Sequence, residues 1–273
     1  MILWQKYASA AWLAANELSL QELAANDLAI ISRPGKARSL LQIPCRQRVS
    51  AEELVRSFGG TARQMPRNWS QSARAQSSHP PIRIGRRLEI LSEPPPPNHR
   101  PHLLIPAAGA FGTGDHATTA MSLRLLEETT RNFPTGWKSL DAGTGTGILA
   151  LAARRFGARD VLGLDNDPRA IAYARQNARL NHIAKIRFSA LDLLLWKPDA
   201  RYEIITANLF SELLIAALPI FHRALVPSGN LIVSGILCGQ AEAVVRALRR
   251  AGFQLGARRR RGKWVALRAR RKT

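Results

Sequence analysis

The stretch Leu140-Asp-Ala-Gly-Thr-Gly-Thr-Gly147 decides the fold of this chain of 273 residues. Its three alternate glycines follow a carboxylate, and a second acid, Asp165, comes one helix and one strand later. Glycines in such a turn let the backbone approach a ligand closely, because no Cβ atom intervenes. A dinucleotide fingerprint G-x-G-x-x-G needs its third glycine where this chain has Ile148, which makes pyrophosphate binding the weaker prediction. The turn therefore predicts a nucleoside cofactor without phosphates, and S-adenosylmethionine fits that description.

From Pro101 onward, segments with strand and helix patterns alternate, which is typical of a mostly parallel sheet covered by helices on both faces. The expected strands are 138–142, 160–164, 185–189, 202–207 and 230–234. The expected helices are 118–130, 148–156, 168–180, 211–225 and 240–251. Segments 253–259 and 263–268 then predict an antiparallel terminal hairpin. This is the layout of the Rossmann-like class I methyltransferase fold rather than of a dinucleotide dehydrogenase.

The composition of the chain and its polar and proline-rich segments predict a small α+β domain over 1–65, a linker over 66–101 and the methyltransferase domain over 102–273. The linker contains a polar stretch, 70–81, and a proline run, 94–97, which favours a semi-rigid spacer. The expected elements of the small domain are a helix over 10–25, strands over 28–32 and 39–44, the turn 33–36 between them, and a second helix that begins at a capping box, 50–53, and ends before Gly59-Gly60.

The two cysteines, Cys45 and Cys238, lie far apart in the sequence and predict no disulfide framework, which favours a reducing compartment. The mildly apolar stretch 2–15 is interrupted by Lys6, so we expect neither a signal peptide nor a membrane span. We therefore expect a cytoplasmic protein without a metal site. A monomer is favoured, although the sequence does not determine the oligomeric state.

The chain is strongly basic: 40 Lys and Arg face 19 Asp and Glu, for a net charge of +21. The last 17 residues alone carry nine basic groups, interleaved with Trp264, Val265 and Leu267. Two interpretations stay open for this hairpin. It is either a solvated sheet edge or a contact surface for RNA or a ribosomal particle.

Several polar residues follow the ends of expected strands, where ligands bind in open α/β sheets. Gly143 and Gly145 would let the backbone approach the cofactor. Asp165 is expected to accept hydrogen bonds from a ribose diol, while Asp167 caps the next helix. Asp192 is either an acceptor for the adenine amino group or a solvated turn carboxylate.

Asn208 presents a carboxamide at the same edge, and its oxygen could accept the N–H of an amine and orient it. Methyl transfer is an in-line displacement at an activated carbon, so alignment of the acceptor dominates catalysis. Phe210 could wall the acceptor site or pack against the following helix. By composition alone, residues 109–119 are a flexible glycine loop that leads into a helix capped by Thr118 or Thr119 and carries an exposed His116.

The stretch Ala110-Phe-Gly-Thr-Gly-Asp-His-Ala-Thr-Thr119 resembles the A-F-G-T-G-x-H-x-T-T loop of the bacterial ribosomal protein L11 methyltransferase family. Further blocks of that family are matched in order and spacing. They are Trp69, 84–88 (I-G-x-R-L), 140–150, 163–168, 207–210 and 231–237. The resemblance covers residues 66–273 well and the first 65 loosely.

The resemblance implies that S-adenosylmethionine binds through Thr118, Gly143, Asp165 and Asn208, with Phe111 and its loop covering the methyl donor. It also implies a protein N-methyltransferase whose acceptors are the α-amine and lysine ε-amines of ribosomal protein L11, docked by the small N-terminal domain. Such amines arrive protonated, and either water or His116 would take the proton.

Two alternatives remain open. An RNA methyltransferase on the same fold would suit the basic tail, but Asn208-Leu209-Phe210 lacks the N-P-P-[YF] pattern that holds a flipped adenine. A non-catalytic module that binds ribosomes through its arginines would not need candidate residues at every cofactor position.

Overall fold

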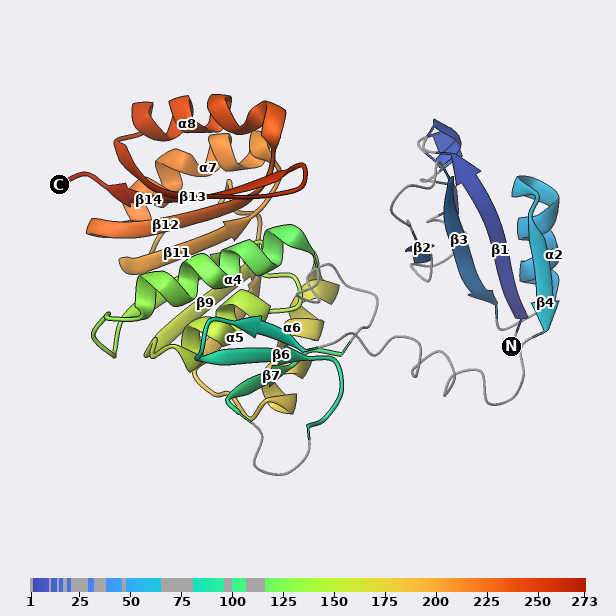
Figure 1. Cartoon of the computed structure of the whole chain (residues 1–273), viewed down its shortest axis with the longest axis horizontal. Helices are drawn as coiled ribbons and strands as arrows, with labels where there is room; N and C mark the ends of the chain where they lie inside the picture. The colour runs from blue at the N-terminus through green and yellow to red at the C-terminus, as the bar shows by residue number, and fades with distance from the viewer. Residues whose placement is uncertain are drawn as a thin grey trace. The chain divides into compact units, whose positions relative to one another are not determined.

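A computed structural model describes residues 2–9, 11–13, 15–16, 19–20, 29–31, 38–45, 48–64, 81–95, 100–106 and 116–273. The chain forms two compact units, Met1–Ser78 and His79–Thr273 (Figure 1). Four predicted features lie wholly or mostly outside the described residues: the turn 33–36, Trp69, the polar stretch 70–81 and the glycine loop, of which 107–115 are not described.

The first unit is an antiparallel sheet with the strand order β2-β3-β1-β4. Its elements are β1 (Ile2–Ser9), β2 (Ala29–Ile31), β3 (Arg38–Cys45), α2 (Arg48–Phe58) and β4 (Thr61–Gln64). Gly59 ends α2 with a φ of 68° and donates its N–H to the Val55 carbonyl, as a glycine stop requires. Both predicted strands and the second helix are confirmed, and the described parts of 10–25 are helical. The central strand β1 was not predicted.

The expected linker over 66–101 is wrong for its second half. Strands β5 (Ile82–Ile84), β6 (Leu88–Leu91) and β7 (His102–Leu104) form a small sheet in the second unit, with the order β5-β6-β7. Ile84, Leu88 and Leu103 are buried in the core of that unit. These strands are only three or four residues long, so their pattern was hidden among the charged and proline-rich neighbours.

Arg87, in the turn between β5 and β6, holds this small sheet to the rest of the second unit. Its guanidinium donates to the carbonyl of Glu127 at 3.5 Å, to Thr130 Oγ1 at 3.1 Å and to the carbonyl of Phe156 at 3.3 Å. It also lies over the Phe156 ring, 4.6 Å from the centroid. The arginine of the I-G-x-R-L block is therefore a structural clamp.

The second unit is built on a seven-stranded sheet with the order β10-β9-β8-β11-β12-β14-β13. The first five strands in this order pair in parallel, whereas β14 pairs antiparallel with both β12 and β13. Their bounds are β8 (Lys138–Ala142), β9 (Asp160–Asp165), β10 (Ile186–Ala190), β11 (Tyr202–Asn208), β12 (Leu225–Leu237), β13 (Phe253–Arg261) and β14 (Trp264–Arg271). The order confirms the predicted class I methyltransferase fold with its terminal antiparallel hairpin.

Five α-helices alternate with these strands, as predicted. They are α4 (Ala117–Thr130), α5 (Ile148–Arg155), α6 (Pro168–Leu180), α7 (Ser211–Ala224) and α8 (Ala241–Arg250), with a short 3-10 turn, Cys238–Gln240, before the last. Local chemistry explains where α6 begins: Pro168 occupies its first turn, and Asp167 accepts the N–H of Arg169 as the N-cap. In α4 the N-cap is His116, and neither predicted threonine caps the helix.

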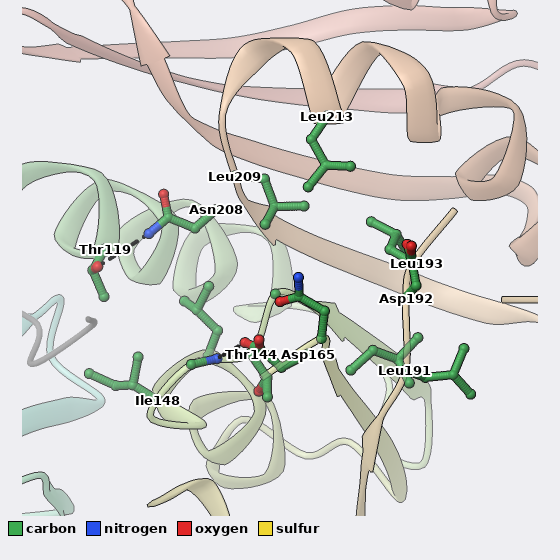
Figure 2. Close-up of a pocket in the computed structure, with 15 residues that line it drawn as sticks. Thr119, Thr144, Ile148, Asp165, Leu191, Asp192, Leu193, Asn208, Leu209 and Leu213 are labelled. Carbon is green, nitrogen blue, oxygen red and sulfur yellow. Dashed lines mark hydrogen bonds between the residues drawn. The ribbon is translucent and has the colours of Figure 1, made fainter. Parts of the chain in front are cut away.

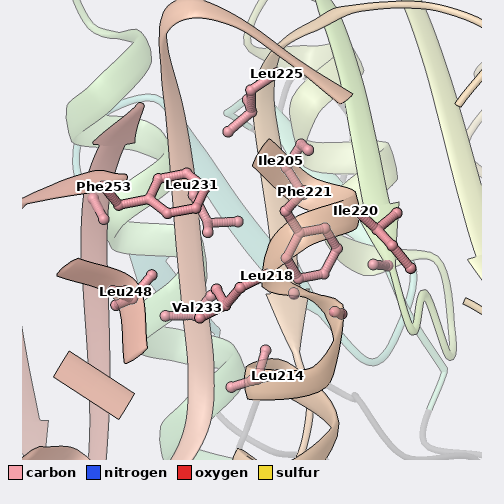
Figure 3. Close-up of a cluster of buried hydrophobic side chains, with 14 of the residues drawn as sticks. Ile205, Leu214, Leu218, Ile220, Phe221, Leu225, Leu231, Val233, Leu248 and Phe253 are labelled. Atoms are coloured by element: carbon pink, nitrogen blue, oxygen red, sulfur yellow. The ribbon is translucent and has the colours of Figure 1, made fainter. Parts of the chain in front are cut away.

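Each face of the sheet carries a hydrophobic core. Side chains of α7 and α8 pack on one face with β11, β12 and β13, including Phe221, Leu248 and Phe253 (Figure 3). Helices α4, α5 and α6 bury their apolar sides on the other face. Each fully buried leucine or phenylalanine contributes roughly 1.5–3 kcal/mol, so the two layers hold the strand ends rigidly in place. Within the described residues, no helix is long and apolar enough to cross a membrane.

Candidate active site

A pocket opens at the carboxyl ends of the central strands β8, β9 and β11 (Figure 2). Ligands of open α/β sheets bind at this edge, where the strand order reverses. The pocket brings together five predicted site residues: Gly143, Gly145, Asp165, Asp192 and Asn208. Its other lining residues are Thr119, Thr144, Ile148, Leu149, Leu164, Asn166, Leu191, Leu193, Leu209 and Leu213.

The three glycines of the turn have a left-handed backbone conformation. Gly143, Gly145 and Gly147 have φ angles of 70°, 53° and 80°. A Cβ atom on Gly143 would lie 2.3 Å from Cδ2 of Leu209, so any other residue would have to displace the Leu209 side chain at the pocket wall. A Cβ atom on Gly147 would instead meet Ala174 at 3.0 Å. Gly143 therefore keeps the pocket wall clear of a side chain, and Gly147 allows α5 to pack closely against α6.

Asp165 is oriented by two backbone N–H groups. Its Oδ2 accepts from Gly145 at 2.9 Å and its Oδ1 accepts from Asp167 at 3.1 Å. Each carboxylate oxygen retains capacity for a second hydrogen bond. Such a fixed carboxylate can accept both hydroxyls of a ribose diol, and Asp167 performs the helix-capping role as predicted.

Asn208 ends β11, and its Nδ2 donates to Thr119 Oγ1 at 3.3 Å (Figure 2). Its Oδ1 has no hydrogen-bond partner among the described residues, so it can accept from a ligand. Gly235 supports the adjacent backbone from behind, because a Cβ atom there would lie 2.4 Å from the carbonyl oxygen of Leu209. The sequence singled out Gly235 only as part of a family block and assigned it no role.

Asp192 lines the pocket and stabilises its own turn, since its Oδ1 accepts the N–H of Leu194 at 2.8 Å. Its Oδ2 makes no hydrogen bond with the part of the chain that the structure describes. The wall beside it is apolar and includes Leu191, Leu193 and Leu213 (Figure 2). An acceptor at the rim of an apolar slot suits a flat heterocycle that carries an amino group.

Asp141 is buried beneath the glycine turn. It accepts hydrogen bonds from Thr144 Oγ1 and Thr206 Oγ1, both at 2.7 Å, and from the N–H of Ala150 at 3.2 Å. Burial outweighs these hydrogen bonds and raises the pKa of Asp141 to about 6. Asp141 thus joins β8, β11 and the start of α5 from below, without contacting the pocket.

The remaining predicted residues lie outside the pocket lining. Thr118 is buried, and its Oγ1 is 2.7 Å from Nδ1 of His116, so Thr119 rather than Thr118 faces the pocket. The His116 ring packs edge-on against Trp264, and burial together with the charge of Lys263 lowers the pKa of His116. Phe111 lies outside the described residues. Phe210 is 73% exposed at the N-cap of α7.

Sequence reasoning missed Thr119, Thr144 and the apolar wall. Helical periodicity could have separated the two threonines, since successive residues of a helix point in directions about 100° apart. The side chains on the apolar wall gave no signal of their own, because leucines in such segments are more often core than ligand contacts.

Comparisons with known proteins agree with this geometry. A family model described as ribosomal protein L11 methyltransferase matches residues 42–272. The ribosomal protein L11 methyltransferase of Desulforapulum autotrophicum is 42% identical over 162 residues, which are 58% of this chain and 52% of that protein. The same enzyme of Pelotomaculum thermopropionicum is 40% identical over 195 residues, which are 70% of this chain and 62% of that protein.

Among solved structures, a ribosomal protein L11 methylase from Lactobacillus delbrueckii subsp. bulgaricus is similar, with a TM-score of 0.65 and 31% identity. The similarity covers 71% of this chain and 100% of that one. This chain spans between about half and two thirds of the length of the curated relatives that it matches. With 231 residues inside the match to the family model, the chain belongs to the ribosomal protein L11 methyltransferase family.

Proposed function

We propose that the protein transfers methyl groups from S-adenosylmethionine to amines of a ribosomal protein, with L11 as the acceptor. The observation that carries this proposal is the pocket in which Gly143, Asp165 and Asn208 converge at the switch point of the sheet. Family membership over residues 42–272 supports the identity of the acceptor.

The residues of the pocket fit the cofactor. The left-handed Gly143 leaves room for close backbone approach, and Asp165 offers two oriented oxygens to the ribose hydroxyls. The leucine wall would take the adenine, with Asp192 accepting from its amino group. When bound, S-adenosylmethionine supplies a methyl group on a positively charged sulfur, which needs no further activation by the protein.

The protein would therefore contribute alignment and exclusion of water. Asn208 Oδ1 accepts an N–H of the acceptor amine and directs its lone pair toward the pocket, while the hydrogen bond from Nδ2 to Thr119 fixes the carboxamide. Correct orientation of this kind supplies several kcal/mol of a displacement barrier. Phe210 is exposed beside this position and would wall the acceptor site.

For proton removal we propose His116, acting at the end of the covering loop that includes Phe111. The lowered pKa of His116 keeps the ring neutral at pH 7, the form that accepts a proton. If this is its role, kcat/KM of the wild type falls below pH 6.5, and His116→Gln removes that limb of the profile. An unchanged acid limb in the variant would assign the proton to water.

The proposal includes three further expectations, which concern the docking of the acceptor, the location and oligomeric state of the protein, and its contact with RNA. The first unit would dock the acceptor protein. The protein would work as a cytoplasmic monomer. The basic C-terminal hairpin would contact RNA or the ribosomal particle that carries the acceptor.

Transfer of a radiolabelled methyl group to fractionated ribosomal subunits tests the function. Label in a ribosomal protein, lost with Asn208→Ala, is the expected result. Label in RNA would favour an RNA methyltransferase instead. Cofactor binding without any labelled product would favour a non-catalytic binding module.

A further inference from the structure

Helix α7 begins at a residue that is unusual for a helix start. Its N-cap position is held by Phe210, whereas Ser, Thr, Asp and Asn are preferred there because their side chains accept backbone N–H groups. Phe210 makes no such hydrogen bond, and it is exposed instead of packing in the core. An aromatic residue that neither caps a helix nor packs in a core contributes little to folding. Departures of this kind from local rules are expected at functional sites.

The backbone of Phe210 is fixed on both sides. Before it, the N–H of Leu209 donates to the carbonyl of Ser234 at 3.1 Å, and Gly235 leaves room for the Leu209 carbonyl alone. After it, the N–H of Leu214 donates to the Phe210 carbonyl at 3.0 Å, and Leu214 is fully buried in the core. The exposed ring therefore projects from a rigid stretch of chain.

Gln240 holds the two residues that follow Phe210. It lies at the N-cap of α8, next to α7 (Figure 1), but its side chain makes no hydrogen bond to its own helix. Instead, its Oε1 accepts the hydroxyl of Ser211 at 2.9 Å, and its Nε2 donates to Oε1 of Glu212 at 3.1 Å. One carboxamide thus binds the first turn of α7 at a buried serine and at an exposed glutamate.

This contact acts on the acceptor side of the site more than on the cofactor wall. Phe210 follows two residues after Asn208, the residue that would orient the acceptor amine. Leu213 lines the cofactor pocket, but its neighbour Leu214 is anchored in the core and holds the rest of α7 in place. Loss of the Gln240 carboxamide would therefore free the turn that begins at Phe210 and leave the cofactor wall where it is.

We infer that Gln240 is a positioning residue, which binds Ser211 and Glu212 and thereby holds the Phe210 ring against the methylene groups next to the acceptor amine. A ring that is ordered before binding does not have to be ordered by the acceptor, so less binding free energy is lost. This inference rests on the proposed function and adds to it a residue that does not line the pocket.

The test is a double-mutant cycle with a matched control. Gln240→Leu removes both hydrogen bonds, Phe210→Ala removes the ring, and the third variant carries both substitutions. The control is Glu242→Leu, in the same first turn of α8. It removes the 2.8 Å ion pair with Arg258, which joins α8 to β13 and not to α7. For each variant we would measure KM and kcat with ribosomal protein L11 and the Kd of S-adenosylmethionine.

Gln240→Leu should raise the KM of the acceptor roughly three- to tenfold, the size expected when one side chain must be ordered on binding. Its kcat at saturating acceptor and its Kd for the cofactor should stay unchanged. In the Phe210→Ala background the same substitution should have no further effect on KM, and Glu242→Leu should leave KM unchanged. Independent effects of the two substitutions, or a weaker Kd for the cofactor, would overturn the assignment.

Fluorine NMR gives a readout that does not depend on activity. In protein labelled with fluorophenylalanine, the Phe210 signal is identified by its absence from Phe210→Ala. That signal should narrow in Gln240→Leu, because the ring becomes more mobile, and keep its width in Glu242→Leu. An equal width in both variants would overturn the positioning role and leave the proposed function standing. A wild-type protein that methylates no ribosomal protein would overturn the proposed function, and the role of Gln240 toward the acceptor with it.

Discussion

Gly143→Ala tests whether the backbone of the glycine turn forms the cofactor wall. An L-residue at a φ of 70° costs roughly 1–2 kcal/mol, whatever surrounds it. The new Cβ atom would also lie 2.3 Å from Cδ2 of Leu209, more than 1 Å inside the usual contact of about 3.5–4.0 Å. In the protein without ligand, the Leu209 side chain can rotate into the pocket at little cost.

When the cofactor is bound, the Leu209 side chain can no longer rotate in this way, because the rotated side chain would occupy the space that the cofactor needs. Overpacking of this kind costs about 1–3 kcal/mol, which corresponds to a roughly 5- to 150-fold increase in Kd. Gly136→Ala is the matched control, since its φ is 92° and no atom lies within 4 Å of its Cβ position. Thermal unfolding should show similar destabilisation of both variants.

Isothermal titration with S-adenosylmethionine should separate the two variants: weaker binding for Gly143→Ala and unchanged binding for Gly136→Ala. Equal affinities would refute the placement of the cofactor against this turn. A larger loss of stability for Gly143→Ala, with unchanged Kd, would show that the turn serves the fold alone.

Three further substitutions test residues that hold the site or the fold around it in place. Gly235→Ala would push a Cβ atom to within 2.4 Å of the Leu209 carbonyl and displace the neighbouring Asn208, so kcat should fall at least tenfold; unchanged kcat in steady-state assays would contradict this. Arg87→Met should cost about 2–3 kcal/mol in chemical denaturation without changing cofactor Kd, because hydrogen bonds from a charged donor are lost far from the pocket; a weakened Kd would show that the clamp also shapes the site. The pKa of Asp141 is raised from 3.8 to about 6, so the folded state holds this proton more tightly than the unfolded chain, and the free energy of unfolding should drop by about 2.4 kcal/mol as pH rises from 4 to 7. Asp141→Asn should remove that drop, and an identical pH dependence in the variant would disprove it.

The wound core could be predicted from the sequence because local and global signals agree there. Asp167-Pro168 marks the start of α6, and Gly157 follows the end of α5. Apolar strands then alternate with these helices in a fixed order. Where each element has its own start and stop chemistry, the bounds fall within one or two residues of the prediction, except for the longer β12 and β14.

The elements that were missed lack such signals. Strand β1 contains Gln5 and Lys6 in its centre and becomes a strand only because Trp4 and its neighbours are buried against α2. The short strands β5–β7 owe their burial to tertiary contacts with α4 and α5, which composition does not reveal.

The candidate site was predictable where a residue type is demanded by geometry. The left-handed φ and the nearby Leu209 favour glycine at 143, and Asp165 and Asn208 lie at strand ends that meet at one edge. Which of Thr118 and Thr119 lines the pocket could not be predicted, since that depends on which face of α4 meets the pocket.

Mass spectrometry of ribosomal protein L11 after incubation with this protein and S-adenosylmethionine tests the central claim most directly. We predict mass increases that correspond to whole numbers of methyl groups on the α-amine or on lysine ε-amines. We predict no such increase when the Asn208→Ala variant replaces the wild type. Methyl groups on carboxylates, on RNA or on no product at all would contradict the account.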